Sequence, residues 1–244
     1  MTAKALTYTS YLRVDELLAL QSPRSPEPEH DELLFIVIHQ VYELWFKQLL
    51  HEAARLQRAL TAGNPWEALH TLARIRSILK TAVAQVDILE TMTPLSFAGF
   101  RHRLESASGF QSAQFREWEA VLGRRDPGML SPHPTGPARD RIEAAMSRPS
   151  LYDSFLQFVG VAPGQDPVPV LEAIYADDAT RAMVCERMID LDEGVQEWRY
   201  RHVKMVERTI GSKSGTGGST GTGYLRQTLH RPVFPALWEV RSRF

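Results

Sequence analysis

The sequence predicts an all-α protein, a helix bundle with a few short additional pieces. Apolar residues recur at helical spacing over three long stretches, residues 31–60, 66–90 and 177–210, and almost nothing alternates as a strand would. Proline-containing turns separate these stretches and do not interrupt them. We therefore expect the 244 residues to form a single domain that carries an excursion.

The N-terminal third contains two of these helices. Residues 1–30 look irregular and then weakly helical through "RVDELLALQ", and "SPRSPEPEHDE" is a proline-rich turn. The helix over 31–60 follows, and Asn64 and Pro65 then suit the N-cap and first position of the next helix. Thr93-Pro94 ends that second helix.

The middle of the chain differs in kind. A short amphipathic stretch, "SFAGFRHRL", precedes "SGFQSAQFREWEAVLG", which predicts a helix from about Ser108 to Gly123. Residues 124–170 hold 8 of the 15 prolines, so this region is expected to be an excursion with short helices at "RDRIEAAMS" and "SLYDSFLQFVG". The third long helix then resumes near Asp177 and ends at Gly211, before a glycine-dense segment and a short closing piece, "PVFPALWEVRSRF".

Composition and charge argue against several classes of partner. A net charge of −1 disfavours a nucleic acid or an anionic membrane as the main partner. The lone Cys185 rules out an internal disulfide. No uninterrupted apolar run approaches the roughly 18 residues that span a bilayer, and the N-terminus lacks the apolar core of a signal peptide. We expect a cytoplasmic protein.

Two histidines, His39 and His202, lie on the apolar faces of their helices. Each could be a core histidine satisfied by a hydrogen bond. Alternatively, the pair could flank a haem, because a cavity in a helix bundle lined by an imidazole is a common haem site. Spacing alone leaves both interpretations open. The sequence has no Cys-x-x-Cys-His for covalent haem and no His-Glu-x-x-His for zinc. Cys185 is a possible thiolate ligand, although a single buried cysteine is more often inert.

Two further positions suggest ligand binding. Arg101 follows Phe97 by one helical turn, and an arginine beside an aromatic ring can clamp a carboxylate, although a surface arginine fits the pattern as well. Thr216 lies in the glycine-dense segment 211–223, which is either a flexible linker or a loop that orders over a ligand. The segment is not a P-loop, since Ser212 stands directly before Lys213, where that pattern requires a glycine.

Taken together, six segments resemble the tryptophan 2,3-dioxygenase family in order and spacing. The resemblance covers most of the chain and is poor from about 124 to 175, where this sequence is shorter. "HDELLFIVIHQ", "SGFQS" and "GTGGS" are its most specific parts. The segments are "LTYTSYLRVDELLALQ", "HDELLFIVIHQVYELWFKQLLHE", "LETMTPLSFAGFRHRL", "SGFQSAQFR", "WRYRHVKMVERTIG" and "GTGGSTGTGYL".

The resemblance implies an all-α enzyme that encloses a b-type haem, active as Fe²⁺, and that adds O2 across the indole C2–C3 bond of L-tryptophan to give N-formylkynurenine. It implies that His202 is the axial ligand of the iron and that His39 hydrogen bonds the indole N–H. Phe35 would pack on the indole. Arg101 would hold the substrate carboxylate, and Thr216 the ammonium and carboxylate end.

The resemblance also implies a homotetramer in which the N-terminal segment, residues 1–30, reaches a neighbouring subunit. Tyr8, Tyr11 and Leu12 would complete the neighbour's pocket, and Phe97 occupies a position that is Tyr or Phe in the family.

The sequence departs from the family in "TYTSYL", where relatives usually carry a glycine after the first tyrosine and this chain has Thr9 and Ser10. Some members of this fold oxidise substituted tryptophans in natural-product pathways, or insert one oxygen atom only. This is the alternative function. A third interpretation is a haem-binding sensor or carrier without turnover, which would not need the amino-acid clamp of Arg101 and Thr216.

Overall fold

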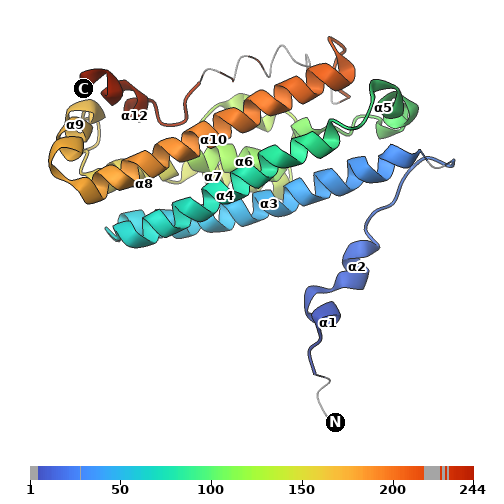
Figure 1. The fold of residues 1–244 in the computed structure, drawn as a ribbon, viewed down its shortest axis with the longest axis horizontal. Helices are drawn as coiled ribbons and strands as arrows, with labels where there is room; N and C mark the ends of the chain where they lie inside the picture. Colours follow the sequence, from blue (N-terminus) through green and yellow to red (C-terminus); the bar gives the residue numbers. More distant parts are fainter. Residues whose placement is uncertain (1–4, 28, 217–225, 227–228, 230) are drawn as a thin grey trace.

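Three long helices lie side by side and form the body of the molecule (Figure 1). The structure is a computed structural model, and it describes residues 5–27, 29–216, 226, 229 and 231–244. Helix α4 (Pro65–Leu89) packs between α3 (His30–Thr61) and α10 (Ala179–Ile210). No strand occurs among the described residues, which confirms the all-α prediction.

Shorter helices complete the bundle. Helices α6 (Ala113–Leu122) and α8 (Leu151–Val159) pack on α3, and α7 (Pro137–Ser147) packs on α6. Helix α9 (Pro167–Asp177) contacts α10. Helix α5 (Pro94–Arg101) lies at the end of the bundle where α10 terminates, and α12 (Pro235–Glu239) lies near the C-terminus (Figure 1).

The helix boundaries follow the capping chemistry. The Asn64 side chain accepts a hydrogen bond from the Glu67 N–H, and Pro65 occupies the first turn of α4, as predicted. Gly211 ends α10 with a φ of 61°, a conformation that favours glycine.

Two predictions about the middle of the chain were wrong. Helix α6 begins at Ala113 and not near Ser108, because Ser112 is its N-cap and Ser108 caps only a 3-10 turn at Gly109–Gln111. Helix α9 was not predicted, because Pro167 and Pro169 suggested a loop. Both prolines lie in its first turn, where a missing N–H breaks no helical hydrogen bond.

The core is formed by inward residues of the long helices and of α6, α8, α9 and α12. Cys185 is part of it and is fully buried, and burial raises the pKa of its thiol to about 12. The thiol is therefore protonated at neutral pH, and it does not line the cavity described below.

Helix α3 is the one described helix long and apolar enough on average to cross a membrane. Charged residues such as Glu43 and Lys47 interrupt its apolar residues, so the helix contains no uninterrupted apolar run of membrane-spanning length. Here α3 packs along α4, α6 and α8 and buries the carboxylates of Glu32 and Glu52. Those contacts are typical of the core helix of a bundle, which passes the same composition test.

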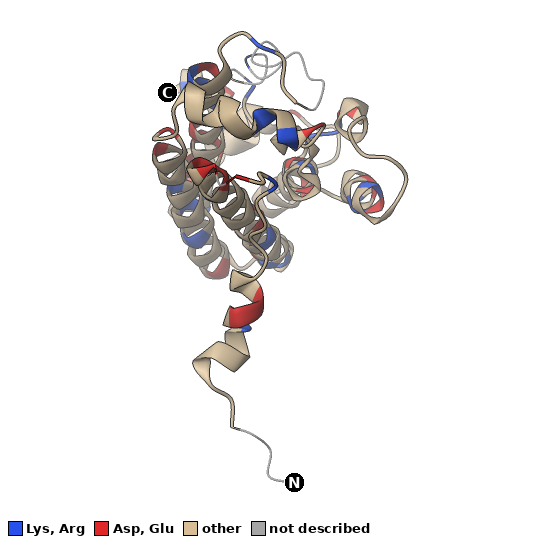
Figure 2. Ribbon diagram, turned by 90° about the vertical axis from the view of Figure 1, so that its right-hand side faces the viewer, with Lys and Arg blue, Asp and Glu red and all other residues tan. Residues whose placement is uncertain are grey.

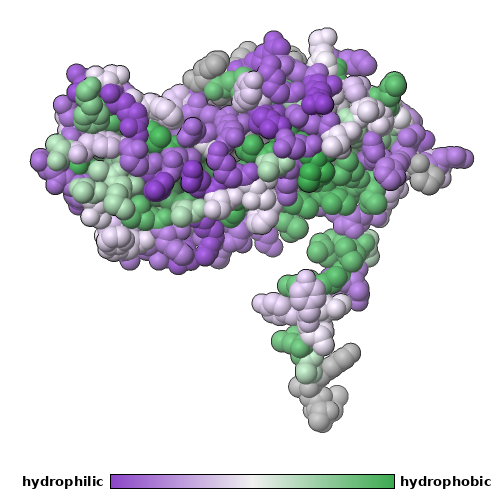
Figure 3. Space-filling view, viewed as in Figure 1, coloured by the Kyte–Doolittle hydropathy of each residue, from purple (hydrophilic) through white to green (hydrophobic). Residues whose placement is uncertain are grey.

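The N-terminal segment projects from the body (Figures 1 and 2). Its helices α1 (Tyr8–Leu12) and α2 (Val14–Leu18) contain no buried residue. Exposed apolar side chains include Leu6, Tyr8, Tyr11 and Leu12. Figure 3 shows hydrophobic residues on this segment and on the adjoining part of the bundle. We call residues 5–19 the arm and residues 20–27 and 29 the strap.

Candidate active site

A cavity opens between α3, α5, α6 and α10, at the end of the bundle nearest α5. Six of the residues singled out in the sequence line it together. They come from four separate parts of the chain, and most of the remaining wall is apolar. The six residues are Phe35, His39, Phe97, Arg101, His202 and Thr216. Tyr8, Tyr11 and Leu12 lie on the arm, exposed and outside this cavity.

The tautomer of His39 is set by its own helix. Its Nδ1 lies 2.7 Å from the carbonyl oxygen of Phe35, one turn earlier. A carbonyl can only accept, so Nδ1 carries the hydrogen and Nε2 remains an acceptor. Burial lowers the pKa of His39 below its ordinary value of 6.5, although the Phe35 hydrogen bond and the Glu43 carboxylate act in the opposite direction. His39 is therefore a neutral hydrogen-bond acceptor in the cavity wall.

Aromatic rings surround this imidazole. The ring of Phe35 lies 4.1 Å from that of His39, 5.8 Å from that of Phe97 and 5.5 Å from that of Phe100, between centroids. Because α5 packs against α3, two helices that are far apart in the sequence supply one aromatic wall. Such a wall suits a flat apolar group carrying a polar edge.

His202 differs from His39 in having no hydrogen bond from the described residues to its ring. Its ring stacks on Trp198, parallel to within 4° and 5.1 Å away. Burial, reinforced by the nearby His39 and Arg116, lowers the pKa of His202 to about 4. His202 is therefore not a core histidine that is satisfied by a hydrogen bond from the described residues. His202 is a neutral imidazole whose lone pair is available to an occupant of the cavity.

Arg101 and Thr216 lie at one end of the cavity and hold neutral partners. The Arg101 Nη2 donates to the carbonyl oxygen of Ser214 at 2.5 Å, and the Thr216 hydroxyl donates to that of Ala107 at 2.5 Å. These bonds fix residues 214–216 beside α5. Thr216 is the last described residue within the predicted ligand loop 211–223, and positions 217–223 of that loop lie outside the described residues.

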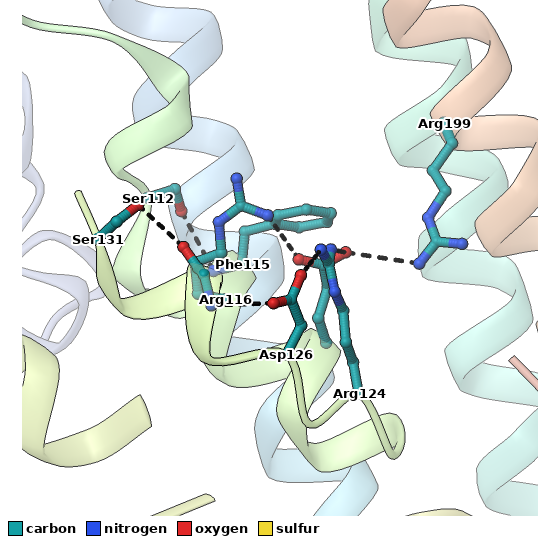
Figure 4. Close-up of polar contacts among 9 residues, drawn as sticks. Ser112, Phe115, Arg116, Arg124, Asp126, Ser131 and Arg199 are labelled. Atoms are coloured by element: carbon teal, nitrogen blue, oxygen red, sulfur yellow. Dashed lines mark hydrogen bonds and ion pairs between the residues drawn. The ribbon is translucent and has the colours of Figure 1, made fainter. Parts of the chain in front are cut away.

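At the other end, three arginines surround one carboxylate (Figure 4). Glu119, only 3% exposed, accepts from Arg116 at 2.6 Å, from Arg124 at 2.9 Å and from Arg199 at 3.5 Å. Asp126 also accepts from Arg124, at 2.8 Å. Burial lowers the pKa of Arg199, and Glu119 partly compensates. The group joins α6 to α10.

Sequence reasoning missed this arginine group. The one indication of this group in the sequence is that Arg116 and Glu119 are spaced i,i+3, so that they can pair on a helix. They lie in the same stretch as the aromatic residues Phe115 and Trp118. Such a pair usually lies on a solvent-exposed face. Its burial here depends on contacts of α6 with α3 and α7, which the sequence does not reveal.

Two buried donors in the cavity wall lack an acceptor among the described residues. They are the indole Nε1 of Trp198 and the Nε of Arg116, which is itself 6% exposed. A buried donor is normally satisfied, so the wall is built for an occupant or ordered water that supplies acceptor atoms. No group of three or more His, Cys, Asp or Glu residues suited to a metal ion exists within the described part of the chain.

Comparison with known proteins gives a consistent result. The family profile described as tryptophan 2,3-dioxygenase matches residues 1–131 and 169–244, which leaves out most of the proline-rich excursion. A tryptophan 2,3-dioxygenase from Anaeromyxobacter dehalogenans is 60% identical, over 98% of this chain and 96% of its own. The tryptophan 2,3-dioxygenase of Herpetosiphon aurantiacus is 54% identical, over 98% of this chain and 99% of its own. The tryptophan 2,3-dioxygenase of Caulobacter vibrioides is 41% identical, over 99% of each chain.

Proposed function

Since the chain belongs to the tryptophan 2,3-dioxygenase family, we propose that its cavity binds haem b and L-tryptophan and that His202 would hold the haem iron. The chain is an enzyme that cleaves tryptophan oxidatively, as the names of relatives up to 60% identical indicate. The observation that supports this proposal best is the meeting of His39 and His202, both neutral, in one apolar cavity beside an arginine.

The residues present fit a haem. His202 offers an unprotonated nitrogen without a competing hydrogen bond, and its ring is held by stacking on Trp198. The unsatisfied Trp198 and Arg116 donors match an occupant that carries acceptor oxygens, as the carboxylates of a haem do. When bound as Fe²⁺, the haem would supply the binding and activation of O2.

His39 would act on the indole N–H. Its Nε2 is the free acceptor, because Nδ1 is committed to the Phe35 carbonyl. A hydrogen bond from the indole nitrogen to Nε2 orients the ring and stabilises the positive charge that develops on the indole as its C2–C3 bond is oxidised. The imidazole need not remove the proton, so its loss should slow the reaction without abolishing it.

The remaining residues would hold the amino acid in position. Phe35 and Phe97 would pack on the indole faces, and the guanidinium of Arg101 would exchange its neutral Ser214 partner for the substrate carboxylate. Thr216, tied to Ala107, would present its oxygen to the ammonium group. These contacts act by orientation, which can be worth several orders of magnitude in rate.

The pocket would be completed by another subunit. Tyr8 and Tyr11 are 77% and 72% exposed on an arm that leaves its own body, and Leu12 lies beside them. Apolar side chains exposed in this way are expected to be covered by a partner. We propose a homotetramer, cytoplasmic, in which each arm covers a neighbour's cavity with these three residues.

The test is the haem content and the product of the His202→Ala variant and the wild-type protein. The variant should lose the haem absorbance, whereas His51→Ala, which changes an exposed histidine on α3, should keep it. A His202→Ala protein with full haem content contradicts the ligand assignment. For the wild type, reduced haem protein with L-tryptophan and O2 should give a product two oxygen atoms heavier.

The product mass also decides the alternative function. A gain of one oxygen atom, or turnover only of ring-substituted tryptophans, would favour a natural-product pathway. The names of the relatives give no support to that alternative.

A further inference from the structure

The strap is attached to the bundle through a buried carboxylate. Glu32, in the first turns of α3, is only 2% exposed. Its two oxygens accept the backbone N–H groups of Arg24 at 2.6 Å and Ser25 at 3.1 Å. Two N–H donors on one carboxylate fix both the position and the direction of the strap at this point, because charge-assisted hydrogen bonds are short and directional.

A second attachment lies two helical turns further along α3. The Gln40 side chain donates to the Leu20 carbonyl at 3.2 Å and accepts from the Gln21 side chain at 2.6 Å. Residues 32 and 40 are eight positions apart, which is about 12 Å along a helix. Two attachments at that separation define a line, so the strap lies along α3 and cannot pivot about one point.

The strap also touches the helix that carries the proposed substrate clamp. Gly99 of α5 lies directly under the Glu29 carboxylate, so that a side-chain carbon there would come within 2.9 Å of it. Phe97 and Arg101 are on the same short helix. The strap is therefore seated between α3 and α5, at the rim of its own protomer's cavity.

Among the described residues, no hydrogen bond or ion pair joins the arm to the bundle. The described ion pairs and side-chain hydrogen bonds of residues 5–19 join Thr7 to Ser10 and Arg13 to Glu16, both within the arm, or reach Gln21 of the strap. Their backbone hydrogen bonds stay within the arm or reach Leu20 of the strap. The direction in which the arm leaves the body is consequently set by the strap, and the strap is set by α3.

We propose that Glu32 is a positioning residue for the neighbouring subunit's active site: it aims the arm of its own chain into the cavity of a second copy. This inference rests on the proposed function, in which Tyr8, Tyr11 and Leu12 complete that cavity. It adds that a residue of one protomer, outside the cavity described above, controls turnover in another protomer. Glu32 itself does not line the cavity of its own chain.

Hybrid tetramers test this inference. One protomer carries Tyr8→Ala and Tyr11→Ala, which disable its arm, and the other carries Arg101→Ala, which disables its pocket. The two protomers are co-expressed with different tags, and the hybrids are purified through both tags. In these hybrids only the first protomer has an intact pocket, and only the second has an intact arm. Activity well above that of either parent would show that the arm acts in trans.

Glu32→Gln is then added to one protomer at a time. A glutamine leaves one acceptor and turns an NH2 group toward the second N–H donor, so the strap should detach in part. Placed on the arm-donating protomer, Glu32→Gln should lower the rescued kcat/KM by about tenfold, the loss expected for one charged hydrogen bond. Placed on the protomer with the working pocket, it should have little effect.

Two further variants make the test decisive. Glu27→Gln, the same change at an exposed carboxylate of the strap, should leave the rescue unchanged on either protomer. Gln40→Ala, which removes the second attachment, should give a smaller loss with the same asymmetry. A loss of equal size on both protomers, or no loss on the arm donor, would overturn the proposal. If the hybrid shows no rescue even without Glu32→Gln, the arm assignment fails first and the inference fails with it.

Discussion

The two ends of the cavity hold arginines of different kinds. Arg101, at the α5 end, is half-buried and donates to a backbone carbonyl. Arg116, at the α6 end, is 6% exposed and paired with the Glu119 carboxylate. A carbonyl is a neutral partner that a ligand carboxylate can displace, whereas a buried carboxylate cannot leave without exposing unpaired charge. An arginine with a neutral partner, such as Arg101, is thus a candidate substrate clamp, whereas an arginine with a buried carboxylate partner, such as Arg116, forms a structural ion pair.

The largest effect on stability should come from breaking the α6 end. Glu119→Gln leaves Arg116, Arg124 and Arg199 without their shared carboxylate, and removing one partner of a buried ion pair costs about 3–5 kcal/mol. Urea denaturation should show this loss. Glu117→Gln, two residues earlier, breaks only a pair with the half-exposed Arg141 and should cost about 1 kcal/mol or less. Equal losses for the two variants would contradict the structural role of Glu119.

The α5 end should show the opposite behaviour. Arg101→Ala is expected to lower kcat/KM for L-tryptophan by about 10²-fold, because a misplaced substrate reacts slowly. The free energy of unfolding should change by less than about 0.5 kcal/mol, since a neutral hydrogen bond at the surface is replaced by water. Arg101→Lys should recover only part of the loss, because lysine lacks the planar fork. Normal tryptophan binding by the Arg101→Ala variant would contradict the assignment of Arg101 as the substrate clamp.

A smaller effect of the same kind is expected for Thr216→Val. The variant keeps the shape of the side chain and removes the hydroxyl that donates to Ala107. A loss of about tenfold in kcat/KM is expected, equivalent to one hydrogen bond. Thr209→Val is the matched control, because the Thr209 hydroxyl also lies at the cavity but is bonded within its own helix to Met205. A similar loss in both variants would mean that cavity polarity, and not the Thr216 contact, matters.

The smallest expected effect concerns pH. The folded pKa of His39 lies below 6.5, so the neutral form persists as the pH falls to 6.5 and the acceptor on Nε2 is lost only below it. The acid limb of the kcat/KM profile should therefore lie below pH 6.5 and should disappear in His39→Gln. An acid limb at or above pH 6.5 that persists in the variant would assign it to another group.

The long helices and one end of the cavity could be predicted from the sequence. The 3.6-residue periodicity and the caps at Asn64 and Gly211 defined the helices to within two residues. Periodicity also placed His39 and His202 on inward faces. Assigning a role to Arg101 or Thr216 required the family resemblance, because their partners Ser214 and Ala107 are more than 100 residues away in the chain.

What could not be predicted depends on tertiary contacts. Arg116, Glu119, Arg124 and Arg199 read as ordinary surface charges, since nothing local to α6 indicates that α3 and α7 bury it. Helix α9 was missed because prolines mark both loops and first helical turns, and only the structure distinguishes these. The tautomer of His39 likewise depends on a distance to the Phe35 carbonyl that residue types alone do not determine.

The burial of Cys185 has a practical consequence. Its thiol is inaccessible and remains protonated at neutral pH, so maleimide reagents should not react with it in the folded protein. A cysteine introduced at Asp15, which is exposed on the arm, would then be the one reactive thiol in each chain. Fluorescent dyes could be attached there without a cysteine-free background, and energy transfer between chains could follow the movement of the arm during turnover.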